Sequence, residues 1–252
     1  MTKFLDAFVI RLYTGFMKHV WLFVGLLMLL VGCGGQETAV PPTPEEVVQH
    51  AADQLQQLAG FAFTIDQSGA PAYVDPTGIV AFKEATGYFV APDKSQAVVK
   101  VAAPGLVTEV QVINIGAAQW QTNIVTGQWE SLPPGAGFNP GALFDANTGL
   151  SAILREDLSD VAFGSAEEQE NGAGLDKALL LVTATAVADK LYSLTGGLIG
   201  PEPVDVALWI APDSWEIRRI IVIEPAAEKK PPSIWKVDFS EYGTVVDIVP
   251  PE

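Results

Sequence analysis

The sequence is poor in the residues that most often build catalytic and metal sites. Its 252 residues include one cysteine, Cys33, and two histidines, His19 and His50. A lone cysteine excludes an intrachain disulfide and a thiolate metal cluster, and a hydrolase triad needs a histidine held against a nucleophile by a carboxylate. His50 lies in a predicted amphipathic helix, and the chain has no Gly-x-Ser-x-Gly motif. We therefore expect His50 to be a solvated surface side chain.

Local motifs for metals and nucleotides are also missing. The acidic pairs Glu156-Asp157 and Glu167-Glu168 lack the spacing of a calcium loop, so we interpret them as solvated charge. The glycine pairs in 135–137 and 172–174 lack the strand–turn–helix context of a phosphate-binding loop and are expected to be turns. We predict no metal, no cofactor and no enzymatic activity. An acid–base carboxylate pair assembled by folding, as in glycosidases, is the catalytic alternative.

Basic residues are scarce relative to acidic ones. The chain has 14 lysines and arginines against 30 aspartates and glutamates; without the first 32 residues, which hold three of the former and one of the latter, 11 and 29 remain, a net charge of −18. Such a negative surface repels nucleic acid and anionic lipid headgroups alike. We therefore exclude nucleic acid as a partner and expect any membrane attachment to come from acyl chains.

No apolar run is long enough for a membrane span. Val20–Val31 holds twelve residues without a charge, whereas a spanning helix needs roughly 20. Lys18 and His19 precede this run, as in a secretory signal peptide, and we expect translation to start at Met17, which would begin a compact leader.

The run ends in Leu30-Val31-Gly32-Cys33, which resembles the lipobox of bacterial lipoproteins. The resemblance implies that residues 1–32 are a lipoprotein signal peptide and that the thiol of Cys33 is acylated as a membrane anchor. The alternative is a lone buried cysteine after a short core helix.

Residues 33–43 are expected to form the lipidated tether, with Gly34-Gly35 and the proline-rich end of this segment keeping it semi-extended. Thr43 and Glu46 then form a capping box, which predicts a helix from Pro44 to about Ala59. From there to the C-terminus we expect one domain, residues 44–252.

Hydrophobic periodicity predicts strands over most of this domain. Apolar residues alternate with polar ones between 61 and 132, and breakers about every ten residues indicate an antiparallel meander. Helical spacing returns in an insert over 139–158, which Asn147-Thr148-Gly149 divides into two short helices.

Strands are predicted again over 159–188, followed by a short helix near 188–198. The remaining predicted strands are 204–210, 215–224, 234–240 and 244–249. This order predicts an α+β fold, a strongly curved antiparallel sheet with helices packed on one face.

Several strands are apolar on both faces, which leaves two interpretations. One is an ordinary two-layer core; the other is a curved sheet that does not close on its helices and leaves an apolar cavity. Alternation and position in the insert select the candidate cavity wall: Val99, Val101, Val110, Val112, Trp120, Leu143, Leu150, Ile153, Leu154, Leu180 and Val182.

Four motifs in sequence order resemble the LppX/LprA/LprF/LprG family of bacterial lipoproteins. They are the hairpin Trp120–Trp129, the insert motif from Asn139-Pro140 to Ile153-Leu154, the strand pair around Leu208–Asp213 and Arg218-Arg219, and the closing Phe239–Gly243. The resemblance implies a fold like the LolA/LolB carriers, a half-barrel sheet with helices over its concave face. It also implies a large apolar cavity for multi-acyl lipids or glycolipids.

The working hypothesis is a lipoprotein anchored to the extracytoplasmic face of the cell membrane. It would bind lipid or glycolipid acyl chains and carry or present them across the envelope, with the insert 139–158 as lid or portal and a membrane transporter as a further partner. The alternative is a non-carrying surface lipoprotein that binds a protein partner or an envelope polymer; an exposed apolar or aromatic patch would favour it.

Overall fold

The computed structural model of the protein describes residues 41–75, 77–133, 139–165, 175, 178–226 and 230–252. Pro42–Glu252 forms one compact unit. The expected signal peptide, Cys33 and most of the tether lie outside the described residues, as do the turns expected at 135–137 and 172–174 and the pair Glu167-Glu168.

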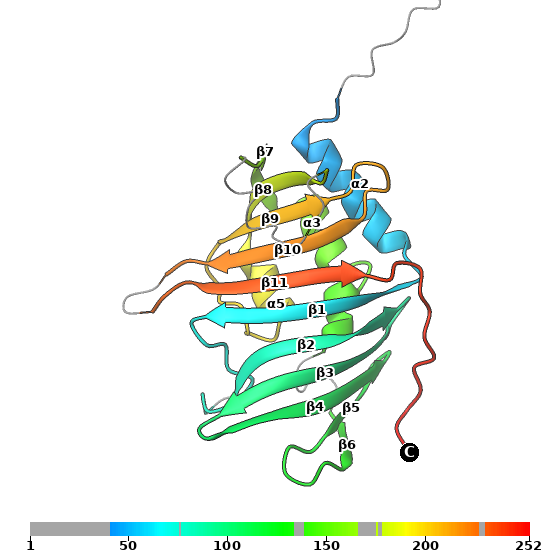
Figure 1. Ribbon diagram of the computed structural model, residues 1–252, viewed down its shortest axis with the longest axis vertical. Coiled ribbons are helices and arrows are strands. Elements are labelled where there is room, and N and C mark those ends of the chain that lie inside the picture. Colours follow the sequence, from blue (N-terminus) through cyan, green and yellow to red (C-terminus); the bar gives the residue numbers. More distant parts are fainter. Residues whose placement is uncertain (1–40, 76, 134–138, 166–174, 176–177, 227–229) are drawn as a thin grey trace, which may run out of the picture. The chain divides into compact units, whose positions relative to one another are not determined.

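The described residues form one eleven-stranded antiparallel sheet (Figure 1). Its order is β6-β5-β4-β3-β2-β1-β11-β10-β9-β8-β7. The strands are β1 (Gly60–Gly69), β2 (Ala81–Val90), β3 (Lys94–Ala103), β4 (Leu106–Ile115), β5 (Ala118–Thr122), β6 (Trp129–Leu132), β7 (Leu158–Phe163), β8 (Leu180–Ala186), β9 (Val204–Ile210), β10 (Ile217–Glu224) and β11 (Ser233–Ser240). The chain thus runs outward from the centre to β6, crosses to the other edge, and returns strand by strand until β11 pairs with β1.

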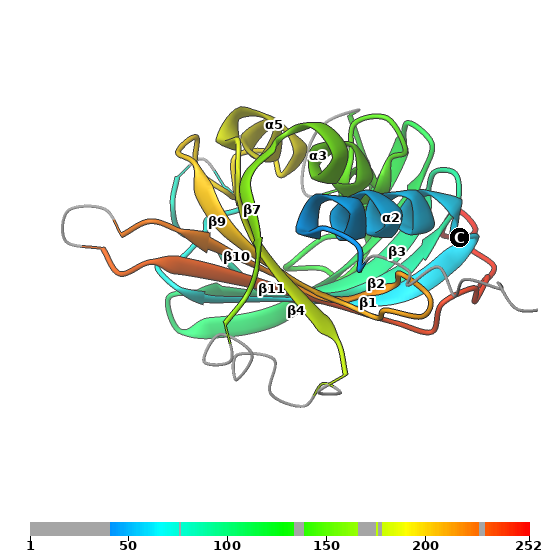
Figure 2. The same ribbon diagram turned by 90° about the horizontal axis from the view of Figure 1, so that it is seen from above.

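The helices gather on one side of this sheet. They are α2 (Pro44–Gln57), the 3-10 helix η2 (Pro140–Phe144), α3 (Leu150–Glu156) and α5 (Ala188–Leu194). Figure 2 shows that the sheet curves around them, so that the helices lie over its concave face. The predicted fold class is therefore confirmed: an open, curved antiparallel sheet with helices over its concave face.

The first helix forms where its capping signals predict. The Thr43 side chain accepts a hydrogen bond from the Glu46 amide (3.3 Å), and the Thr43 amide donates to the Glu46 carboxylate (2.8 Å). The apolar face of the helix is buried and includes Val47, Val48 and Leu55. β1 begins at Gly60. Only glycine fits at this position, because a Cβ would lie 2.3 Å from the carbonyl oxygen of Thr244.

The insert between β6 and β7 is fastened to the rest of the domain at two points. In η2, the Phe144 ring packs against Phe61, Phe63, Phe89 and Phe239, with ring centroids 4.8 to 6.0 Å apart. In α3, the Arg155 guanidinium donates to the Asp53 carboxylate of α2 at 2.9 Å. The insert is therefore part of the main core.

One predicted strand is wrong. Residues 244–249 have the alternation of a strand, yet the structure assigns them no strand pairing. Both edges of β11 are already taken, by β10 and β1, so the chain after Ser240 has no neighbouring edge to join. This segment is fixed by side-chain burial instead, with Ile248 only 1% exposed.

Candidate functional site

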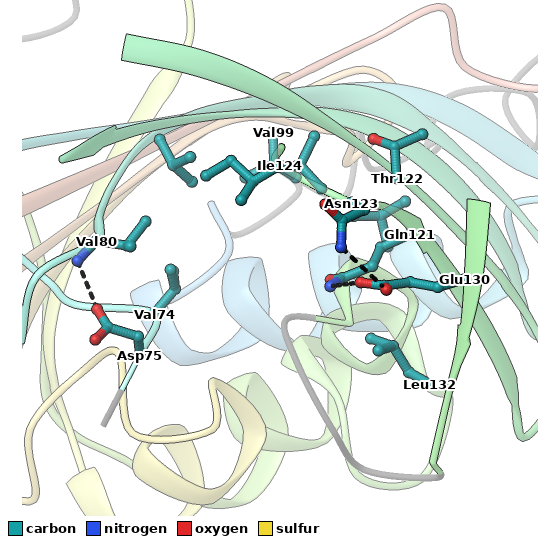
Figure 3. A pocket seen from close by; sticks show the side chains of 13 residues that line it. Val74, Asp75, Val80, Val99, Gln121, Thr122, Asn123, Ile124, Glu130 and Leu132 are labelled. Atoms are coloured by element: carbon teal, nitrogen blue, oxygen red, sulfur yellow. Dashed lines mark hydrogen bonds between the residues drawn. The ribbon is translucent and has the colours of Figure 1, made fainter. Parts of the chain in front are cut away.

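A cavity of about 290 Å³ lies on the concave side of the sheet (Figure 3). Val99 and Val101 of β3 and Val110 and Val112 of β4 line its floor. Successive strand residues point to opposite faces, so this spacing places all four valines on the same side. Because Val99 pairs with Val110 across the two strands, the floor is a continuous aliphatic surface.

The wall beside β5 and β6 is polar. Gln121 donates from its side-chain amide to one oxygen of the Glu130 carboxylate (3.2 Å), and Asn123 donates to the other (3.3 Å; Figure 3). Glu130 itself is exposed. The cavity is therefore amphipathic, with an aliphatic floor and one wall of hydrogen-bonding groups.

The cavity opens to solvent between two turns. Val74, Asp75 and Val80 come from the β1–β2 loop, and Ile124 comes from the β5–β6 turn. Val74 and Ile124 are 37% and 40% exposed, although both line the cavity. These residues form the mouth.

The Asp75 carboxylate organises the loop on one side of this mouth. It accepts hydrogen bonds from the Thr77 hydroxyl, from the Val80 amide (2.5 Å) and from the amides of Ile79 and Thr77 (3.0 Å each). The side-chain bond from Thr77, followed by the amide of Val80, holds the pKa of Asp75 below its usual 3.8, because these donors stabilise the charged form.

This geometry predicts an acid-sensitive loop. Since the folded-state pKa of Asp75 is lowered, its contribution to loop order is fully present above the unfolded-state value of 3.8 and is lost as the pH falls through the lower, folded value. Amide hydrogen exchange of Ile79 and Val80, corrected for the intrinsic effect of pH, should therefore speed up in strong acid and change little between pH 5 and 7. In the Asp75→Asn variant, these two amides should exchange fast at pH 5 and at pH 7. Unchanged exchange in that variant would show that the Asp75 carboxylate does not order the loop.

The structure divides the eleven candidate wall residues among three locations. Val99, Val101, Val110 and Val112 line the cavity. Leu143, Ile153, Leu154 and Val182 are buried in the hydrophobic core, and Leu150 and Leu180 are partly buried against it. Trp120 does not line the cavity: it pairs with Ile113, whereas its neighbour Gln121 pairs with Val112 on the cavity side.

Sequence reasoning missed the mouth and the polar wall. Four of these residues lie outside the strands, where periodicity carries no information: Val74, Val80, Asn123 and Ile124. No sequence pattern indicated Glu130. The available signal was local: valine and isoleucine within turns rich in Gly, Asp and Asn.

A second hollow of about 600 Å³ lies between the insert and α5. Its lining is mixed, with Ala142 and Ala152 on the insert side and Lys190 and Leu194 on α5. Lys190 is 2.7 Å from the Asp157 carboxylate, so its charge is paired. Alanine and leucine thus alternate with charged and hydroxyl side chains around this hollow, whereas four valines form a continuous floor in the first cavity.

Neither a metal site nor a membrane-spanning helix is found in the part of the chain that the structure describes. There, no group of three or more His, Cys, Asp or Glu side chains is placed to hold a metal ion. Nor does any helix in those residues have the length and apolar character needed to cross a membrane. His50 is exposed, as predicted, and stacks on Trp215 with ring centroids 4.9 Å apart.

Comparison with known proteins identifies relatives of the same fold. LprF from Mycobacterium bovis superposes with a TM-score of 0.60 at 16% identity, over 82% of this chain and 96% of that one. The Mycobacterium tuberculosis lipoprotein LppX gives a TM-score of 0.55 at 13% identity, over 83% of this chain and all of that one. A search of curated proteins finds no significant match. The family model of the LppX_LprAFG lipoproteins matches residues 43–248, and the chain belongs to that family.

Proposed function

We propose that this lipoprotein binds the acyl chains of a lipid or glycolipid in its concave cavity and carries or presents them across the cell envelope, tethered by an acylated Cys33. The observation that carries the proposal is the amphipathic cavity, with valines of β3 and β4 on one side and the hydrogen-bonded Gln121, Asn123 and Glu130 on the other. Lipids have the same division into apolar chains and a polar head.

Binding of this kind needs no catalytic group. Each methylene that is buried from water contributes about 0.8 kcal/mol, so burial of an acyl chain drives loading. Hydroxyl groups of a glycerol or sugar would donate to the exposed Glu130 carboxylate and exchange hydrogen bonds with Gln121 and Asn123. We therefore propose a binding role and no reaction.

The size of the cavity bears on how the lipid is held. Its roughly 290 Å³ is just below the range of small-molecule pockets, about 300–1,000 Å³. A multi-chain lipid would need more space than this. Because Phe144 and Arg155 hold the insert against the rest of the domain, we propose that the insert does not move as a lid, and that the chains pass through the mouth between Val74 and Ile124.

Native mass spectrometry tests the proposal. Residues 41–252, secreted without the anchor and checked for folding by circular dichroism, should carry excess mass that organic solvent extracts as lipid. After extraction, the protein should take up added glycerolipid. A folded protein with a clean apo mass and no uptake would reject the lipid-binding function.

One feature favours the alternative of a surface lipoprotein that binds an envelope polymer. A groove of about 290 Å³ also lies on the opposite face of the sheet, lined by Tyr88, Val98, Ile113 and Trp129 together with the amides of Gln96 and Gln111. Aromatic rings beside amide groups suit a polymer with apolar faces and hydroxyl groups. If mass spectrometry finds neither bound lipid nor lipid uptake, this groove becomes the preferred candidate for the binding site.

A further inference from the structure

Three connections lie together at one end of the sheet. In an antiparallel meander, alternate turns fall at the same end, which places the β1–β2 loop, the β3–β4 turn and the β5–β6 turn side by side (Figure 1). Strands in a sheet are about 4.8 Å apart, so these connections extend over roughly 24 Å, the width of six strands. They form one edge of the domain.

This edge carries exposed apolar side chains. Of thirteen large hydrophobic residues exposed in the described part of the chain, five belong to these connections and two are the first residues of β4. We call them the turn rim: Tyr73, Val74, Ile79, Leu106, Val107, Ile124 and Val125. Val107 is 67% exposed and Val125 is 89% exposed. Scattered apolar residues need no explanation, but a cluster of this kind marks an interaction surface.

The turn rim is also nearly free of charge. Segments 70–80, 104–107 and 123–128 contain one side chain that is charged at neutral pH, Asp75, in a protein with 30 acidic residues. The carboxylate of Asp75 is occupied by hydrogen bonds from the amides of Thr77, Ile79 and Val80. This edge therefore carries little of the negative charge by which an acidic protein is repelled from an anionic lipid layer.

We infer that the turn rim inserts into the headgroup–acyl boundary of a lipid bilayer, with the mouth of the cavity facing the membrane. Aliphatic side chains and a tyrosine, with Asp75 as the one charged residue among their segments, suit that boundary. Protein interfaces are instead enriched in aromatic residues, Met and Arg, and the rim contains neither Met nor Arg. As a member of a lipoprotein family, the chain works near a bilayer.

The rim and the cavity share residues. Val74 and Ile124 line the cavity and also belong to the exposed rim. With the rim inserted, an acyl chain would pass between bilayer and cavity along a continuous apolar path. Docking is nevertheless a separate property from the proposed lipid binding, because an empty protein would still dock.

Site-directed fluorescence on the full lipoprotein, stripped of bound lipid, tests the docking. The environment-sensitive dye NBD is attached to Val107→Cys or Val125→Cys, with Val245→Cys as a matched control of 62% exposure outside the rim. The unsubstituted protein, treated with the same dye, serves as the control for any labelling at Cys33. In phosphatidylcholine vesicles, quenchers on the lipid chains should reduce the emission at 107 and 125 at least twofold and leave 245 unchanged.

A double variant, Val107→Asp with Val125→Asp, completes the test. Both positions are exposed, so the fold should be retained, and NBD at Ile79→Cys should lose its quenching in this background. Equal, water-like emission at 107, 125 and 245 would overturn the inference, as would undiminished quenching at 79 in the double variant. NBD emission on the rim that indicates shielding from water in native envelopes, but not on pure lipid vesicles, would also overturn the inference. It would assign the rim to a protein partner.

Discussion

Replacing Phe144 with alanine should lower the free energy of unfolding by about 3–5 kcal/mol, the range for removal of a buried aromatic side chain. Phe144 is 8% exposed and contacts four other phenylalanine rings, with its centroid 4.8 Å from that of Phe61. The substitution leaves a cavity where η2 meets the sheet. It also removes the edge-to-face contacts, which add about 0.5–1.5 kcal/mol per pair beyond burial.

Chemical denaturation followed by tryptophan fluorescence measures this loss. Phe163→Ala is the matched control, because Phe163 is 49% exposed at the edge strand β7 and its removal should change stability by no more than about 0.5 kcal/mol. If both variants lost the same small amount, η2 would not be anchored by its phenylalanine. A large loss for Phe144 alone supports the insert as part of the core.

Replacing Val110 with phenylalanine should reduce co-purified lipid at least tenfold. Val110 lines the cavity floor and is only partly buried, so the larger ring has open space to enter and fills the volume that an acyl chain would occupy. Overpacking a full core typically costs 1–3 kcal/mol, but here the ring extends into a void, and we expect the melting temperature to stay within about 3 °C of the parent.

The control for this variant lies on the neighbouring strand. Val98 is 42% exposed on the opposite face of β3, and Val98→Phe adds the same atoms without entering the cavity. Quantitative lipid extraction from both proteins, normalised to folded protein, decides the matter. Equal lipid in the two variants would remove the valine floor from the binding site.

Sequence periodicity was sufficient for most of the sheet. Residues 94–103 alternate along β3, and the predicted strands 204–210 and 234–240 match β9 and β11 to within one residue. The two short helices of the insert form on either side of the Asn147–Gly149 break, as predicted. Alternation succeeds in β3 because Ala97, Val99 and Val101 are buried on one face, while Val98 on the other face is exposed.

Periodicity could not show which face of a strand lines a cavity. In β5, polar Gln121 lines the cavity while aromatic Trp120 lies on the other face, because the register pairs Gln121 with Val112. Hydropathy alone favours the opposite choice. Similarly, residues 244–249 alternate like a strand, but a strand needs a free neighbouring edge, which is a property of the whole sheet.

The pairing of β1 with β11 has a consequence for how the chain matures. β1 pairs with β11 from Ala62–Ser240 to Gly69–Ser233. The two halves of the sheet can therefore join only after β11 has been synthesised. Until then β1 and β10 are open edges at what will become the centre, and unpaired edges promote aggregation. A chain truncated before Ser233 should therefore aggregate rather than lose a peripheral strand.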